Sequence, residues 1–199
     1  LKDRGIALPL TMGHEIAGEI IAAGPDAKGA KIGSSVVVYP WLGCGECATC
    51  KRGDENLCLK GRSLGVFIDG GYSTHVVVPD AKYCVDLGKL DPAEAAPLAC
   101  SGVTTFSALK KFGDKIKDEP VVIIGAGGLG RMAMTMLKAM GGKGSIIVDT
   151  DAAKREAAVK AGAMSAIDGA AKDAAKQIMA ATGGGALLRN LDVVLRERT

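Results

Sequence analysis

Residues 121–130 read VVIIGAGGLG, and this stretch decides how the second half of the chain folds. Four consecutive β-branched residues predict a buried strand of a parallel sheet, and the glycines that follow predict a turn. The next residues, RMAMTMLKAMG (131–141), have the composition of a helix that ends at a glycine. The stretch therefore predicts a strand, a glycine turn and a helix in direct succession.

The glycines of this turn have separate expected roles. Gly125 permits the tight turn, Gly127 lets the backbone approach a pyrophosphate, and Gly130 allows the helix to pack closely on the strand. Gly128 and Leu129 lie at the helix N-terminus, where free N–H groups and a partial positive charge favour phosphates. The motif alone is weak in a chain with 28 glycines, so its surroundings decide the interpretation.

Asp149 supplies that context. It ends the next predicted strand, GSIIVDTD (144–151), about 20 residues beyond the turn, where a dinucleotide fold places an acid on the ribose. A carboxylate there repels a 2′-phosphate, which favours NAD over NADP. The alternative is a helix-capping or solvated acid, but Thr150 and Asp151 are better placed to cap. Asp151 is the expected N-cap and Gly162 the expected C-cap of the following helix.

From about residue 101, strands and helices alternate, which predicts βαβ units and a parallel sheet. The remaining expected elements are helix TTFSALKKF (104–112), helix DAAKREAAVKAGA (151–163), strand MSAIDG (164–169) and helix AAKDAAKQIMAATGGG (170–185). Residues 1–100 instead predict short strands and turns, an all-β or α+β unit. Its expected strands are EIIAA (19–23), SSVVVYP (34–40) and YSTHVVVPD (72–80). We therefore expect two domains, 1–100 and 101–199.

A cysteine-rich loop, GCGECATCKRGDENLC (43–58), interrupts the first domain. Cys44, Cys47, Cys50 and Cys58 follow the spacing C-x2-C-x2-C-x7-C, which suits four thiolates on one structural zinc. Four unrelated core cysteines would lie among apolar residues rather than among glycines and charges. A zinc ribbon that grips nucleic acid is disfavoured by the weak net charge of +3.

His14 lies in MGHEIAG (12–18) beside Glu15. The metalloprotease pattern His-Glu-x-x-His fails because Gly18 occupies the second histidine position, so any metal partner of His14 must come from elsewhere. His75 matches no ligand motif and reads as a strand residue with a local hydrogen bond. Cys84 reads as a small core residue, and the methionine-rich helix at 132–140 as core packing.

Composition limits the class of protein. The 199 residues are 48% hydrophobic, the charges are mixed in sign, and aromatic residues are 4%, which argues against nucleic-acid and membrane partners. No stretch approaches the length of a membrane span, and the start has no signal-peptide core, so the chain reads as cytoplasmic. Six cysteines in such a chain favour thiolates on metal over disulfides.

With these motifs in order, the chain resembles the zinc-dependent medium-chain alcohol dehydrogenase family, prokaryotic NAD-dependent type. The resemblance implies a GroES-like β domain followed by an incomplete Rossmann domain, a doubly wound parallel sheet. The residues that carry it are GHEIAGEI (13–20), the cysteine loop (44–58), PLACSGVTTFSAL (97–109), GAGGLG (125–130) and VDTDAAKREAAVKAGA (148–163).

The resemblance also assigns roles. His14 and Cys100 match ligands of a catalytic zinc, with Glu15 the neighbouring acid or an alternative ligand. Thr104 matches a threonine near the nicotinamide, Asp149 the ribose acid, and Lys154 a lysine lining the adenosine side. The four cysteines of the loop match the structural zinc site.

The implied activity is oxidation of an alcohol to an aldehyde or ketone, with hydride transfer to NAD, in a homo-oligomer (dimer or tetramer) acting on a small molecule. Three alternatives stay open: a polyol or ring-hydroxyacyl-thioester dehydrogenase of the same family, a fragment that only binds zinc, and a dinucleotide-binding module without catalysis.

Two departures from the family shape the expectation. The family has a further cysteine ligand upstream of the histidine, yet residues 1–13 contain no cysteine. The second half of the coenzyme domain is also missing, and LLRNLDVVLRERT (187–199) does not resemble its continuation. We therefore expect a piece of a longer protein with little or no activity of its own, which NAD-linked alcohol oxidation by the purified chain would contradict.

Overall fold

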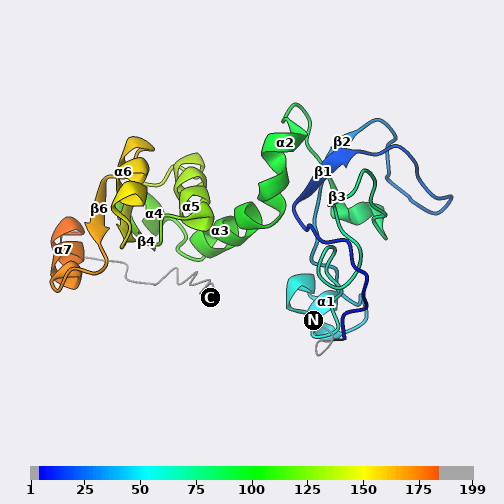
Figure 1. The fold of residues 1–199 in the computed structure, drawn as a ribbon, viewed down its shortest axis with the longest axis horizontal. Helices are drawn as coiled ribbons and strands as arrows, with labels where there is room; N and C mark the ends of the chain where they lie inside the picture. The colour runs from blue at the N-terminus through cyan, green and yellow to red at the C-terminus, as the bar shows by residue number, and fades with distance from the viewer. Residues whose placement is uncertain (1–4, 184–199) are drawn as a thin grey trace. The chain divides into compact units, whose positions relative to one another are not determined.

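The structure is a computed structural model that describes residues 5–183. The chain divides into two compact units, Leu1–Cys100 and Ser101–Thr199. Figure 1 shows short strands and loops in the first unit, and alternating strands and helices in the second. The expectation for residues 187–199 lies outside the described residues.

The first unit is built on an antiparallel sheet in the order β1-β2-β3, formed by β1 (Ile16–Glu19), β2 (Ser35–Val38) and β3 (Cys84–Asp86). Alternate residues of β2 serve two clusters, as the period of a strand requires. Val38 packs with Ile16, Leu64 and Tyr83, whereas Val37 packs with residues of the two short helices α2 (Pro92–Ala95) and η4 (Ala96–Ala99).

Two strand predictions in this unit are wrong. Residues 16–19 form β1, so the strand overlaps the predicted EIIAA run only at Glu19. Residues 72–80 form no strand, and Val77 is 85% exposed. Both segments line a cavity of about 580 Å³. Val76 and Val78 pack against the cluster around Leu64 and Tyr83, while Val77 faces outward. The run therefore contributes to the core without pairing as a strand, and local propensity does not decide its conformation.

The cysteine loop carries two short helices, α1 (Ala48–Lys51) and η2 (Glu55–Leu57). We call residues 42–61 the cysteine lobe; it is the cyan segment around α1 in Figure 1. A further helical turn, η3 (Ala81–Tyr83), leads directly into β3. Leu42 and Cys50 are the only buried residues of the lobe, so the lobe has little apolar core of its own.

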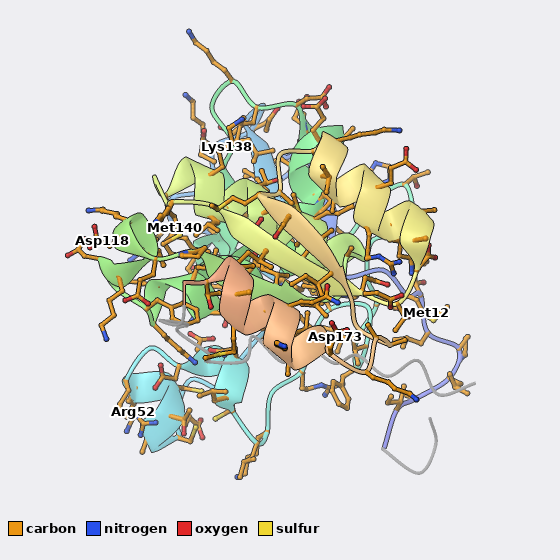
Figure 2. The ribbon with its side chains drawn as sticks, turned by 90° about the vertical axis from the view of Figure 1, so that its left-hand side faces the viewer. Met12, Arg52, Asp118, Lys138, Met140 and Asp173 are labelled. Atoms are coloured by element: carbon orange, nitrogen blue, oxygen red, sulfur yellow. The ribbon has the colours of Figure 1, made fainter. Side chains whose placement is uncertain are left out.

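The second unit is a parallel sheet in the order β4-β5-β6, formed by β4 (Val121–Ile124), β5 (Ser145–Asp149) and β6 (Ser165–Asp168). One face packs on α3 (Ser101–Lys110), α4 (Lys115–Asp118), α5 (Gly128–Ala139) and α6 (Ala152–Lys160). The other face packs on α7 (Ala174–Ala181). Figure 2 shows α7, with Asp173 at its start, on the side of the sheet opposite α6.

Both faces of this sheet are covered by helices, which explains why the predicted strands and helices of this unit are confirmed. Ile123 and Ile147 point to one layer, while Val122, Ile146 and Val148 point to the other, so each strand is apolar on both sides. Every helix and strand expected between residues 104 and 183 is present. The methionine-rich helix packs into the core through Met134, as expected.

The ends of α6 are also as predicted. The Asp151 carboxylate accepts hydrogen bonds from the backbone N–H groups of Ala153 (2.9 Å) and Lys154 (3.2 Å). Gly162 follows the helix with φ +103°, the left-handed conformation that favours glycine. Within the part of the chain that the structure describes, no helix has both the length and the apolar character needed to cross a membrane.

Replacing Asp151 with alanine should lower the free energy of unfolding by about 1 kcal/mol, because two N–H groups of α6 lose their acceptor. Asp173→Ala is the matched control: Asp173 also precedes a helix, but its side chain caps no backbone N–H. Urea unfolding of both variants checks the expectation, and equal effects would contradict the capping role.

Candidate functional site

The four cysteines of the lobe converge on one point. Their sulfur atoms all lie within 4.8 Å of one another. The Sγ–Sγ distances are 3.9 Å for Cys44–Cys50, 3.5 Å for Cys47–Cys50 and 3.9 Å for Cys47–Cys58. A zinc ion with Zn–S bonds of 2.3 Å in a tetrahedron separates its sulfurs by about 3.8 Å. The spacing therefore fits one tetrathiolate zinc.

Backbone donors support thiolates at this point. The N–H of Cys50 donates to Cys47 Sγ (3.5 Å), and the N–H of Cys44 donates to Cys58 Sγ (3.4 Å). The bond from Cys50 N–H is the largest cause that lowers the pKa of the Cys47 thiol. Burial instead raises the pKa of the Cys50 thiol. A cation that attracts all four thiolates would therefore have to displace the Cys50 proton.

His14 and Cys100 meet although they are far apart in the sequence. His14 Nε2 lies 3.3 Å from Cys100 Sγ, and both residues belong to the first unit and are half-buried. Nitrogen and sulfur ligands on one tetrahedral zinc lie about 3.6 Å apart, so this pair also fits two ligands of one metal. The ring of Trp41 packs against the His14 ring, with centroids 5.5 Å apart.

Close backbone packing places His14. Gly13 has φ +98°, and its carbonyl accepts the N–H of Gly71 (2.8 Å). The preceding carbonyl of Met12 accepts the N–H of Tyr72 (2.9 Å). A Cβ on Gly13 would lie 2.9 Å from the Tyr72 nitrogen, and Cβ atoms on Gly65 or Gly70 would collide with the Gly13 backbone. Glycines at these points let two chain segments approach and fix the histidine.

The other two residues assigned to this site by the resemblance are not joined to it. Among the described residues, only the lobe cysteines form a group of three or more candidate ligands, so the Glu15 carboxylate does not complete a set with His14 and Cys100. Glu15 is exposed, and its charge adds to burial in raising the pKa of the Cys100 thiol. Thr104 lies exposed on α3 in the second unit. Their roles stay predictions.

The glycine turn has the geometry that the sequence predicts. Gly125 has φ +96°, and Gly127 caps the start of α5 without a side chain. Gly127 and Gly128 are exposed and would meet nothing within 4 Å if they carried a Cβ, whereas a Cβ on Gly130 would collide with the Gly125 carbonyl. Leu129 is half-buried in the first turn. The turn therefore presents open backbone, and its third glycine is required by packing.

Asp149 is tied to this turn. Its Oδ2 accepts the N–H of Ala126 (2.7 Å), and its Oδ1 accepts the N–H of Asp151 (2.8 Å). Burial alone would raise the pKa of the carboxyl, but these bonds, with Lys154 and Arg155 nearby, outweigh burial and lower it. A carboxylate is thus held at the end of β5 beside the turn. Arg155 also donates to the Asp149 carbonyl (2.8 Å) and pairs with Asp168 (3.5 Å).

Several contact residues had no clear signal in the sequence. Trp41 is the one tryptophan of the chain and lies just before the cysteine cluster, which could have singled it out. Arg155 sits inside a helical pattern that gives no hint of its contacts.

His75 is exposed and makes a local bond to Thr74 Oγ1 (3.0 Å), as expected, although it lies in no strand. Cys84 is half-buried at the start of β3, where it lines the cavity.

The chain is similar in sequence to several alcohol dehydrogenases. The alcohol dehydrogenase GroES-like domain family matches residues 2–89. The chain is 41% identical over 199 residues to an NAD-dependent alcohol dehydrogenase of Sulfurisphaera tokodaii, and the match covers 100% of the chain and 57% of the relative. It is 41% identical over 180 residues to an alcohol dehydrogenase of Geobacillus stearothermophilus, covering 89% of the chain and 52% of the relative.

Solved structures of dehydrogenases are also similar to this chain in fold. The D-arabinose dehydrogenase from Sulfolobus solfataricus matches with a TM-score of 0.83 and 36% identity, over 91% of this chain and 56% of that one. The alcohol dehydrogenase from Aeropyrum pernix matches with a TM-score of 0.77 and 31% identity, over 90% of this chain and 53% of that one. The chain spans a little more than half the length of these relatives.

Replacing Gly13 with alanine should destabilise the first unit by about 1–3 kcal/mol, because φ is unfavourable for a side chain and the Cβ meets Tyr72. Gly18→Ala is the matched control, since Gly18 lies in β1 with nothing within 4 Å of a Cβ. Thermal and urea unfolding compare the two, and a neutral Gly13→Ala would show that His14 is not held by this packing.

Proposed function

We propose that the chain belongs to the zinc-type medium-chain dehydrogenase family and that its protein oxidises an alcohol to an aldehyde or ketone with hydride transfer to NAD. The observation that carries the proposal is the approach of His14 Nε2 to Cys100 Sγ at 3.3 Å, two ligand types of a catalytic zinc. The names of the relatives support the alcohol substrate and NAD.

Zinc in an open site, when bound, acts as a Lewis acid on the substrate oxygen and lowers the pKa of an alcohol. His14 and Cys100 hold the metal in this proposal, and the Trp41 ring keeps the imidazole in place by contact. Glu15, next to His14, is the acid near the metal or an alternative ligand. The four lobe cysteines hold a second, closed site that leaves no position for substrate.

The second unit supplies the cofactor site. The open backbone at Gly127 and Gly128 and the N–H groups at the start of α5 receive the pyrophosphate, with Gly125, Leu129 and Gly130 shaping the turn. The Asp149 carboxylate accepts the ribose hydroxyls and repels a 2′-phosphate. Lys154 lines the adenosine side, and Thr104 lies near the nicotinamide. When bound here, the nicotinamide would supply the acceptor for the hydride of the alcohol.

The substrate of the whole protein is a small alcohol. A polyol substrate is the second candidate, and one observation favours it: a galactitol-1-phosphate dehydrogenase, named for a polyol phosphate, is among the structures similar to this chain. Rates with a panel of primary, secondary and polyol alcohols distinguish the two. A homo-oligomeric, cytoplasmic protein is part of the same proposal.

His14→Ala should remove one zinc per chain and lower alcohol oxidation by the whole protein by at least about 100-fold, because the metal loses a ligand. His75→Ala is the matched control, since this second histidine is exposed and bonds only locally to Thr74. Elemental analysis and steady-state rates measure both effects. Unchanged zinc content in His14→Ala would refute the ligand assignment.

Asp149→Ser should weaken NADH binding by about 10–100-fold, the cost of losing hydrogen bonds to a charged acceptor, and should tighten NADPH binding. Asp118→Ser removes the same charge from the end of α4 and should leave the ratio of the two affinities unchanged. Nicotinamide fluorescence titrations give the dissociation constants. An unaltered NADH-to-NADPH ratio in Asp149→Ser would contradict the proposed role in cofactor choice.

A further inference from the structure

Three hydrogen-bond donors converge on the carboxylate of Glu55, which lies within the cysteine lobe. Its Oε2 accepts the backbone N–H of Gly43 (3.0 Å) and the hydroxyl of Tyr83 (2.5 Å). Its Oε1 accepts Lys82 Nζ (2.8 Å) in an ion pair. Gly43 directly precedes the first lobe cysteine, whereas Lys82 and Tyr83 belong to η3, outside the lobe. One side chain therefore links the two parts.

The partners of Glu55 are themselves held in place. Tyr83 is buried, stacks on Tyr39 with ring centroids 6.5 Å apart, and has Lys82 Nζ 4.7 Å from its ring centre. The bonds from Lys82 and Tyr83 lower the pKa of the Glu55 carboxyl to about 2. Lys82 and Tyr83 thus favour the ionised carboxylate, and the ring of Tyr83 is packed against Tyr39.

The stem of Glu55 and one sulfur of the candidate metal site both lie close to Gly43. A Cβ added to Gly43 would lie 3.0 Å from the Cβ and Cγ of Glu55 and 2.6 Å from Cys50 Sγ. A side chain at position 43 would therefore collide with a cysteine sulfur and crowd the glutamate, so glycine is needed at this point. The carboxylate bonds to Gly43, Lys82 and Tyr83 rather than to a sulfur, and its negative charge would not by itself favour four thiolates. Its contribution to the lobe is geometric.

We propose that Glu55 is the positioning residue of the four-cysteine site. By tying the N–H of Gly43 to η3, it fixes the entry of the lobe so that the Cys44 and Cys50 sulfurs face the same point as Cys47 and Cys58. The inference rests on the proposed zinc in this lobe. It adds a residue outside the ligand set on which metal retention depends.

The test compares zinc release from the protein in a Cys100→Ser background, so that only lobe zinc is counted. Release to a chromogenic pyridylazo chelator is followed for Glu55→Gln and Tyr83→Phe. An amide at position 55 keeps the shape but cannot accept all three donors, so release should be about 10–100-fold faster, the usual effect of losing a partner that orients ligands. Tyr83→Phe removes one donor and should give a smaller increase.

Glu46→Gln is the matched control. Glu46 is exposed between Cys44 and Cys47, so this variant makes the same charge change beside the same sulfurs. Its release rate should stay within about two-fold of the parent, since it removes charge but none of the bonds that orient ligands. The absorption of a Co²⁺-loaded lobe provides a second measurement, because thiolate charge-transfer and ligand-field bands report the geometry of the four sulfurs. We expect these bands to change in Glu55→Gln and to be unchanged in Glu46→Gln.

The outcomes separate the two claims. If the parent holds zinc and Glu55→Gln matches Glu46→Gln in release rate and in Co²⁺ spectrum, the positioning role is overturned while the zinc site stands. If the folded parent holds no lobe zinc, the zinc assignment and the role fail together. Should Glu55→Gln not fold, an altered Co²⁺ spectrum in Tyr83→Phe supports the role, and an unaltered one overturns it.

Discussion

Four sulfur atoms within 4.8 Å of one another impose the strongest constraint on the first unit. As thiolates they repel one another, and the lobe has little apolar burial to offset that repulsion. A divalent cation reverses the sign of the interaction, so that metal binding and folding of the lobe become one equilibrium. Backbone N–H donors to Cys47 and Cys58, and the Glu55 link at Gly43, then serve to hold a geometry that the cation stabilises.

The sequence predicts most of the second unit because its signals are local. A run such as VVII is apolar on both faces, as a central parallel strand must be, and the capping by Asp151 and the left-handed Gly162 involve only near neighbours. The convergence of the cysteines could likewise be predicted from their spacing. Asp149 was predicted at the end of its strand, but not its bond to the Ala126 N–H, since that contact depends on how β4 and β5 pair.

Long-range packing explains what the sequence could not predict. Residues 72–80 have strand propensity but line a cavity instead of pairing, and β1 lies earlier than the apolar run EIIAA suggests. Trp41 and Glu55 acquire their roles only when distant segments meet, the first at His14 and the second at Tyr83. The pairing of His14 with Cys100 was implied by a family resemblance; spacing alone gives no reason for it.

The two candidate metal sites of the first unit differ in how they are assembled. The lobe ligands fall within one short loop, so closing it costs little chain entropy, and the Glu55 link to η3 adds a single longer-range tie. His14 and Cys100 come from opposite ends of the unit, and their approach requires the sheet, the close packing at Gly13 and the short helices before Cys100 to be formed already. The lobe site therefore depends on a short loop and one link to η3, whereas the His14 site exists only as a consequence of the folded unit. The difference matches the proposed roles: the four-cysteine site is closed and stabilises the fold, whereas the His14 site is open for chemistry. An open site must keep its geometry without a full set of protein ligands, so it needs the folded unit around it.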